Sequence, residues 1–257
     1  MSARPGRRRS IAALLLAVIG PLGATSAVGE NLAVSTLDWP PYTSPALPAG
    51  GAVTQIVTDA FAAVDIDATV LTLPWKRAIS RAKDDAGVVA YFPGYHCRHV
   101  EGFVPSEPIG FGPLGLVENV EAPITWRSID DLGEQQLQIG TVLGYANTDE
   151  FDEKAGTGWL KVVPAADDLT TLRKLLRKRI DAAVIDKLVL SYLLATESSI
   201  AEGQTALAFD ERPLDEKTLY LCFNDTPDGH ALRARFNEGL AQIDVEATIE
   251  RYFLEQF

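Results

Sequence analysis

Three groups of side chains in this sequence could do chemistry at the ends of strands. Trp39 and Tyr42 flank two prolines in "DWPPYT", just past an expected strand, and could offer an apolar or cation–π face to a small molecule. Arg98 follows another expected strand, where a guanidinium could grip a carboxylate in bidentate fashion. Asp186 closes the strand in "DAAVIDK". Open α/β sheets bind their ligands at such carboxyl ends of strands.

Each of these side chains also has an ordinary structural role open to it. The aromatic rings could pack in the core or lie on the surface, and Arg98 could be a surface arginine. Asp186 could be the N-cap of a helix that begins at Lys187. The residues alone leave both interpretations open.

Other chemical motifs are weaker. "GFGPLG", residues 110–115, has the letters of the dinucleotide fingerprint G-x-G-x-x-G, but Pro113 lies inside it and a strand-like "LGLVEN" follows where a helix is required. We therefore expect a turn-rich segment there. His96, Cys97 and His99 are zinc-binding residue types without a second cluster to complete a site, so we expect no metal and no cofactor. Catalysis by carboxylates stays open among the 35 acidic residues.

The elements that would position these residues alternate between strands and helices, which is typical of an α/β protein. Apolar runs predict strands at 32–37, 68–73, 88–92, 137–142, 160–163, 182–185 and 218–223. Helical periodicity predicts helices at 54–64, 74–83, 148–155, 167–179, 187–195, 229–243 and 247–257. Asp167 or Asp168 can cap the fourth of these helices.

The N-terminus has the pattern of a secretory signal peptide: a basic start, a short apolar stretch and small residues before a cleavage point near residue 29. Removing residues 1–29 takes away four arginines and no acid, so the formal charge changes from −12 to −16. Such an acidic chain would be repelled by phosphates, which argues against nucleic acid and anionic lipid as partners. We expect a periplasmic protein without a membrane anchor.

Two cysteines, Cys97 and Cys222, remain in a compartment where disulfides form. A single long-range disulfide and two separately buried thiols are both compatible with their spacing.

Taken together, these segments resemble the periplasmic solute-binding proteins of ABC transporters, of the polar amino acid type (solute-binding protein family 3). The resemblance covers nearly the whole mature chain, and its most specific segment is "RIDAAVIDKLVLSYLL". Other similar segments are "DWPPYT", "LPWKRAISRAK", "CRHVEGFVPSEPI", "IDDLGEQQLQIGTVLGYANTDEF" and "TLYLCFN". The resemblance implies a two-lobed α/β fold of type II, with two sheets flanked by helices and joined by two hinge strands.

The implied boundaries are a signal peptide at 1–29, a first lobe at 30–114, a second lobe at 115–218 and a return to the first lobe at 219–257. The hinge strands would cross near 115–117 and 219–223.

The resemblance also implies a site between the lobes. Arg98 matches the arginine that holds a ligand carboxylate, and Asp186 matches the acid that takes a ligand amine. Trp39 and Tyr42 match the aromatic loop. The remaining matched or pocket-shaping residues are Asn147 and Thr148, which would face the carboxylate, and Trp75 and Tyr91, which would narrow the pocket. The usual small hydroxyl residues after the third strand are replaced by "YFPGY", which favours an aromatic, cyclic or flat solute.

The implied function is a monomeric protein that captures a small, amino-acid-like solute and delivers it to an ABC permease by closing its lobes. Two alternatives share the scaffold. One is a periplasmic lyase resembling cyclohexadienyl dehydratase, with Asp186 or Glu107 as its acid or base. The other is a soluble sensor subunit for a membrane receptor.

Overall fold

The computed structural model describes residues 1–2, 30–97 and 100–256. Most of the predicted signal peptide, together with Arg98 and His99, therefore lies outside the described residues. Within the described part of the chain, no helix combines the length and the apolar character needed to cross a membrane.

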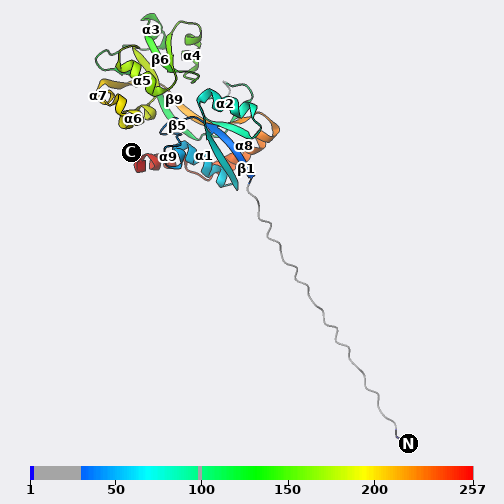
Figure 1. The fold of residues 1–257 in the computed structure, drawn as a ribbon. Coiled ribbons are helices and arrows are strands. Elements are labelled where there is room, and N and C mark those ends of the chain that lie inside the picture. The colour runs from blue at the N-terminus through cyan, green and yellow to red at the C-terminus, as the bar shows by residue number, and fades with distance from the viewer. Residues whose placement is uncertain (3–29, 98–99, 257) are drawn as a thin grey trace.

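The first lobe is built on parallel strands, with β1 between β2 and β3. Helices α1, α2, α8 and α9 belong to this lobe, whose ribbons occupy the lower part of Figure 1. Its elements are β1 (Glu30–Thr36), α1 (Ala52–Ala62), β2 (Ile66–Thr72), α2 (Trp75–Asp84), β3 (Val88–Gly94), β4 (Phe103–Pro105), α8 (Pro227–Leu240) and α9 (Val245–Gln256).

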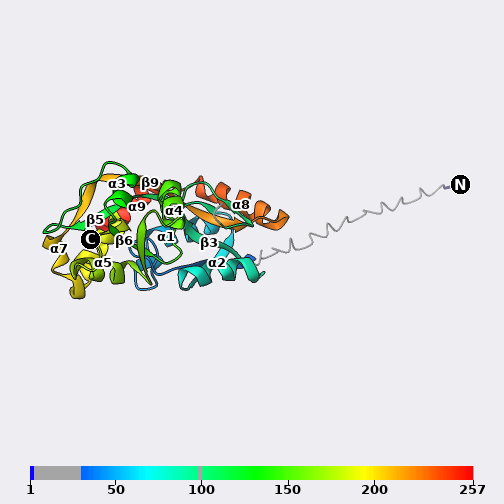
Figure 2. The same cartoon turned by 90° about the horizontal axis from the view of Figure 1, so that it is seen from above.

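The second lobe is a smaller sheet in which β6 lies between β7 and β8, again with parallel neighbours. Figure 2 shows α3, α5 and α7 at one end of the molecule and α2 and α8 at the other. The elements of the second lobe are α3 (Ile129–Glu134), β6 (Gln138–Val142), α4 (Asp149–Gly156), β7 (Lys161–Ala165), α5 (Asp168–Leu176), β8 (Ala182–Asp186), α6 (Lys187–Thr196) and α7 (Gly203–Ala206).

Two long antiparallel strands connect the lobes: β5 (Gly110–Asn119) and β9 (Leu207–Asn224). β9 pairs with β3 and β4 in the first lobe, and β5 pairs with β8 in the second. Between these regions, Phe111–Pro113 of β5 pairs with Glu216–Thr218 of β9. Among the described strand pairs, these six residues pair only with each other. We call these six residues the neck.

The hydrophobic core follows this arrangement. A large buried cluster joins α1 and β1 of the first lobe to α5, β8 and α6 of the second, and Trp39 and Tyr42 are part of it. A second cluster fills the space between β5, β6, α3 and α4. Because the large cluster is continuous between the lobes, their facing surfaces are in contact in this structure.

The predicted strands and helices are confirmed, and most of their ends are displaced by a few residues. The exception is the strand predicted at 218–223, which is the last part of the much longer β9. The turn-rich interpretation of 110–115 is wrong, because the whole segment belongs to β5. Its glycines lie within the ladder that pairs β5 with β9, whose register shifts on either side of Gly115. They therefore mark places where a side chain has no room and not places where the chain reverses. The chain boundaries and the hinge positions derived from the resemblance stay predictions.

Cys97 and Cys222 form a disulfide, with Cα atoms 5.4 Å apart and a sequence separation of 125. Of the two arrangements compatible with the sequence, the structure has the bonded one. The bridge lies in a buried cluster with Tyr91 and Phe103, and it ties the segment after β3 to β9. A cross-link closing so long a loop strongly restricts the unfolded chain.

Replacing both cysteines, Cys97→Ala with Cys222→Ala, is expected to lower the free energy of unfolding by about 2–4 kcal/mol. Urea denaturation of the mature protein measures this. Reductant should shift the wild-type midpoint toward that of the double variant and leave the double variant unchanged. A wild-type protein whose midpoint ignores reductant under denaturing conditions would contradict the role given to the bridge.

Candidate functional site

The aromatic loop lies at the carboxyl end of β1, as the sequence predicts. The Trp39 N–H donates to the Thr43 carbonyl at 2.6 Å and the Thr43 N–H donates back at 3.1 Å, which closes a tight turn around the two prolines. The rings of Trp39 and Tyr42 are stacked with centroids 4.7 Å apart. Both side chains are buried, so the turn directs them toward the second lobe and away from solvent.

Tyr42 and Asp186 connect the two lobes by a buried hydrogen bond. Asp186 is the N-cap of α6, since its Oδ1 accepts from the Leu188 N–H at 2.8 Å and from the Val189 N–H at 3.2 Å. The Tyr42 hydroxyl is 3.1 Å from Asp186 Oδ2 and 3.3 Å from the Phe111 carbonyl oxygen. The prediction that Asp186 caps a helix is confirmed, and the same side chain also forms a contact between the lobes.

Gly112 in the neck makes this contact possible. A Cβ atom at this position would collide with the Tyr42 hydroxyl and with Asp186 Oδ2. Gly112, which belongs to the G-x-G-x-x-G pattern in the sequence, is therefore needed because Tyr42 and Asp186 approach the backbone so closely.

A second buried acid, Asp168, lies at the start of α5. Its neighbour Asp167 caps that helix, accepting from the Thr170 N–H at 2.7 Å, which leaves the Asp168 side chain available to the interior. Asp168 is only 7% exposed and accepts a hydrogen bond from the Trp39 side chain, whose sole donor is the indole N–H. This is another polar contact between the lobes.

Burial raises the pKa of the Asp168 carboxyl to about 7, and the charges of Asp186 and Asp167 act in the same direction. The Trp39 hydrogen bond and the backbone N–H of Asp168 oppose this rise. Two buried carboxyls that repel each other each hold a proton more tightly than an exposed acid.

Burial also raises the pKa of Asp186 to about 7, with a smaller upward contribution from Glu216. The N–H groups of Val189 and Leu188 and the Tyr42 hydroxyl lower it, because they stabilise the ionised form.

The main pocket lies beside these acids, between the lobes, with a cavity volume of about 80 Å³. Five aromatic rings line it: Trp39, Trp75, Tyr91, Tyr95 and Tyr145. The rest of the described lining is mostly aliphatic, with His96 among it. A smaller cavity of about 10 Å³ lies behind the Trp39, Tyr95 and Tyr145 rings and is lined by Asn147, Asp168 and Asp186.

Trp75 reaches across the cleft at the entrance side of the main pocket. Its indole N–H donates to the Gly144 carbonyl at 3.1 Å, and its ring lies edge-on to Tyr91 and Tyr145. An open groove of about 480 Å³, lined by both lobes, also borders Trp75 and Tyr145. Trp75 therefore separates the inner pocket from solvent.

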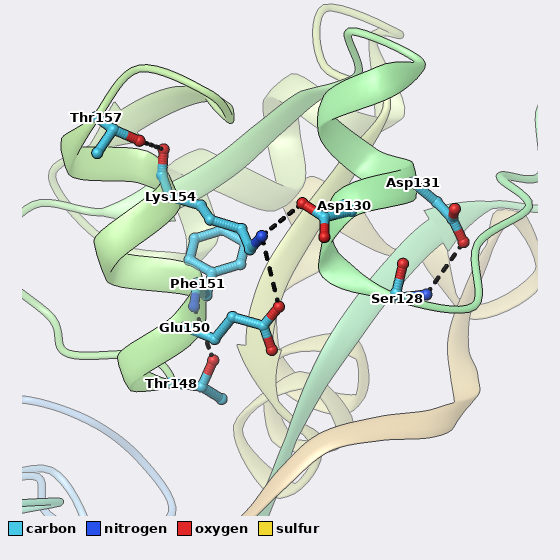
Figure 3. Close-up of polar contacts among 8 residues, drawn as sticks. All are labelled: Ser128, Asp130, Asp131, Thr148, Glu150, Phe151, Lys154 and Thr157. Atoms are coloured by element: carbon cyan, nitrogen blue, oxygen red, sulfur yellow. Dashed lines mark hydrogen bonds and ion pairs between the residues drawn. The ribbon is translucent and has the colours of Figure 1, made fainter.

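Asn147 and Thr148 have partners within the second lobe. Thr148 is the N-cap of α4, where its Oγ1 accepts from the Phe151 N–H at 3.1 Å (Figure 3). Asn147 donates from its side chain and its backbone to Asp152, at 2.7 and 2.8 Å. Figure 3 also shows Lys154 of α4 paired with Asp130 and Glu150, which fixes α4 beside α3. These contacts hold the loop whose residues 144–146 line the main pocket.

The structure thus brings Trp39, Trp75 and Tyr91 together in one pocket and places Asn147 and Asp186 in the cavity behind it. Tyr42 supports Asp186 and Thr148 caps a helix. The ligand-binding roles assigned to all these residues stay predictions, as does that of Arg98.

Sequence reasoning missed Asp168 and Tyr145 as pocket residues, and it included Tyr95 only as the end of the "YFPGY" segment. The pair "DD" at 167–168 carries a usable signal, because only one of two adjacent acids can cap the helix. Each tyrosine follows the carboxyl end of a strand, Tyr95 after β3 in the first lobe and Tyr145 after β6 in the second. Within the described part of the chain, no cluster of three or more His, Cys, Asp or Glu side chains is placed to hold a metal ion.

No protein-family model matches this sequence, and no curated protein matches it. Many solved structures share its fold. The GluR0 ligand-binding core from Nostoc punctiforme, in complex with L-glutamate, aligns over 88% of this chain and 99% of its own with a TM-score of 0.69 and 20% identity. An amino acid ABC transporter substrate-binding protein from Streptococcus pneumoniae, bound to L-arginine, aligns over 87% and 94% with a TM-score of 0.67 and 13% identity.

A histidine kinase sensor domain with similarity to periplasmic binding proteins aligns over 88% of this chain and 95% of its own, with a TM-score of 0.72 and 16% identity. Identities this low establish the fold alone. The chain therefore has the two-lobed, periplasmic-binding-protein-like α/β fold that the resemblance implies.

Gly112→Ala is expected to destabilise the protein by about 1–3 kcal/mol, because its new methyl group must displace either the Tyr42 hydroxyl or the Asp186 carboxylate. Chemical denaturation measures the loss. Gly156→Ala is the matched control, since a Cβ there meets no atom within 4 Å and alanine favours the helix. Equal effects of the two substitutions would show that the neck is not tightly packed.

Asp168→Asn is expected to stabilise the ligand-free protein by about 1–3 kcal/mol at pH 8 and by much less at pH 4. The folded pKa of about 7 lies above the ordinary value of 3.8, so this carboxyl lowers the free energy of unfolding as pH rises through that window, and the loss is complete above pH 7.

The measurement is thermal unfolding of wild type and variant across that pH range. Asp167→Asn is the control, because Asp167 is exposed and asparagine is an equally good N-cap. A gain from Asp168→Asn that does not change with pH would contradict the buried-charge explanation.

Proposed function

We propose that this protein captures a small solute in the aromatic pocket between its lobes and presents the closed form to an ABC permease after export to the periplasm. The observation that carries the proposal is that both lobes contribute to one pocket: Trp39, Trp75 and Tyr91 come from the first lobe and Tyr145 from the second. A solute that contacts both lobes stabilises only the closed form and shifts the population toward it.

The polar contacts between the lobes support closure as the working motion. Tyr42 with Asp186, Trp39 with Asp168 and Trp75 with Gly144 each join one lobe to the other. The neck is the narrow connection about which the lobes would move, because its six residues pair only with each other in the described register.

An amino-acid-like solute fits this proposal. Two proteins that share the fold were solved with L-glutamate and with L-arginine. Arg98 would hold the solute carboxylate, as the resemblance implies. The solute amine would be drawn toward the side of the pocket nearest Asp168 and Asp186.

Two specific observations favour alternatives on the same scaffold. Two cleft carboxyls with pKa values near 7 are a common property of catalytic sites, which favours a lyase. The histidine kinase sensor domain among the similar structures favours a sensing role. A lyase consumes its ligand, whereas a binding protein or a sensor returns it unchanged.

A thermal-shift screen of the mature protein against amino acids, polyamines, small organic acids and aromatic compounds is expected to give a clear hit. A ligand at 100 times its Kd adds about 2.7 kcal/mol, which is about 5–10 °C for a protein of this size. Chromatography after incubation should recover the hit unchanged.

Trp75→Ala should remove the shift, because it opens the pocket wall, whereas Trp159→Ala should keep it, because Trp159 is 45% exposed and lines no part of the pocket. A hit that is consumed would replace the proposal by the lyase. No shift with any compound would remove solute binding altogether.

A further inference from the structure

The rings of the main pocket are arranged as a cage and not as a parallel stack. Tyr95 and Tyr145 are edge-on to Trp39, with interplanar angles of 75° and 82° and centroid distances of 6.1 and 6.4 Å. Trp75 is edge-on to Tyr91 and Tyr145, at 74° and 85°. Rings turned against each other in this way surround one pocket from several directions. The face of an aromatic ring carries partial negative charge.

The charged groups around the cage add to this negative potential. Asp168 and Asp186 line the cavity behind Trp39, Tyr95 and Tyr145, so three cage rings lie directly against that cavity. The Trp39 indole donates its N–H to Asp168, which polarises the ring toward a more negative face. Both carboxyls are buried, and a nearby positive charge would relieve the cost of ionising them.

Lys217 in the neck lies against one ring of the cage. Its Nζ lies 5.6 Å from the Tyr95 ring centroid, but Asp215 accepts from it at 2.8 Å and Glu216 is its neighbour in sequence. The positive charge of Lys217 is therefore neutralised by the acids of its own strand. It does not cancel the negative potential that Asp168 and Asp186 create at the cage.

This environment discriminates between kinds of solute group. A carboxylate in the cage would lie among five aromatic rings, and no described lysine or arginine lines the pocket to balance its charge. A primary ammonium would lose strong hydration and find few acceptors among aromatic and aliphatic walls. A cation whose charge is spread over alkyl groups or over a planar guanidinium gives up little hydration and gains from the ring faces.

We infer that the cage recognises a weakly hydrated organic cation, with Asp168 and Asp186 as its counter-charges and the Trp39, Trp75, Tyr91, Tyr95 and Tyr145 rings as its walls. This inference rests on the proposed solute-binding function and specifies the class of solute.

The test compares each cation with its uncharged isostere by calorimetry on the mature protein at pH 8. Choline and glycine betaine carry a quaternary ammonium, and the carbon analogue of choline has the same shape without the charge. L-arginine carries a guanidinium, and L-citrulline is its uncharged counterpart. We expect the cationic member of at least one pair to bind at least about tenfold more tightly. Tighter binding of choline than of its carbon analogue would identify a quaternary ammonium as the recognised group, and tighter binding of L-arginine than of L-citrulline would identify a guanidinium.

The buried acid provides the second arm. Asp168→Asn keeps the size of the side chain and should reduce the ratio between cation and isostere several-fold, while changing the affinity for the isostere little. Glu250→Gln makes the same charge change on the exposed surface of α9 and should leave the ratio unchanged. A ratio that is equal in wild type and Asp168→Asn would overturn the role of this carboxylate.

The outcomes for the inference and for the proposed function are separate. If uncharged amino acids, organic acids or the isosteres bind as tightly as the cations, solute binding stands and the inference is overturned. If no compound in the wider screen binds, both are overturned. A cation that binds and is consumed supports the cage chemistry while replacing the binding protein by an enzyme.

Discussion

The arrangement of this protein depends on one buried carboxylate, Asp186. It ends β8, caps α6 through two backbone N–H groups and accepts a hydrogen bond from Tyr42 of the other lobe. A carboxylate this deeply buried is tolerated because those donors replace its hydration. The Tyr42 hydroxyl can reach it only because residue 112, in the neck, has no side chain. The start of α6, the contact between the lobes and the pairing of β8 with β5 therefore all involve this one residue.

The contacts between the lobes are suited to a reversible closure. They consist of a few hydrogen bonds and ring contacts around Trp39, Tyr42 and Trp75, set beside a cluster of apolar side chains. Each polar group among them can return to water when the lobes separate, so these hydrogen bonds add only the difference between protein and water partners to the free energy of opening. In the proposed closure, the paired strands of the neck would keep their ladder, which would confine the motion to a narrow region.

Much of the fold could be predicted from sequence, because apolar periodicity is a local property and each strand and helix here carries it. Trp39 could be predicted as a cleft residue from its place after a strand. Asp168 could not be distinguished from Asp167, since the choice of cap depends on three-dimensional geometry. The pairing of the two cysteines could not be predicted, because their sequence separation is 125 and no local pattern links them. The neck glycine was misinterpreted as a turn signal because close approach of a side chain leaves no local pattern.

The positions of Asp168 and Asp186 also help to decide whether the site binds its solute or converts it chemically. A general acid or base must come within hydrogen-bond reach of the reacting atom. Asp186 is engaged by Tyr42 and by the start of α6, and Asp168 is engaged by the Trp39 indole. The rings of Trp39, Tyr95 and Tyr145 lie between these carboxyls and the main pocket. Charge acts through an aromatic wall, whereas proton transfer does not, so this geometry favours recognition of a charged solute over its chemical conversion.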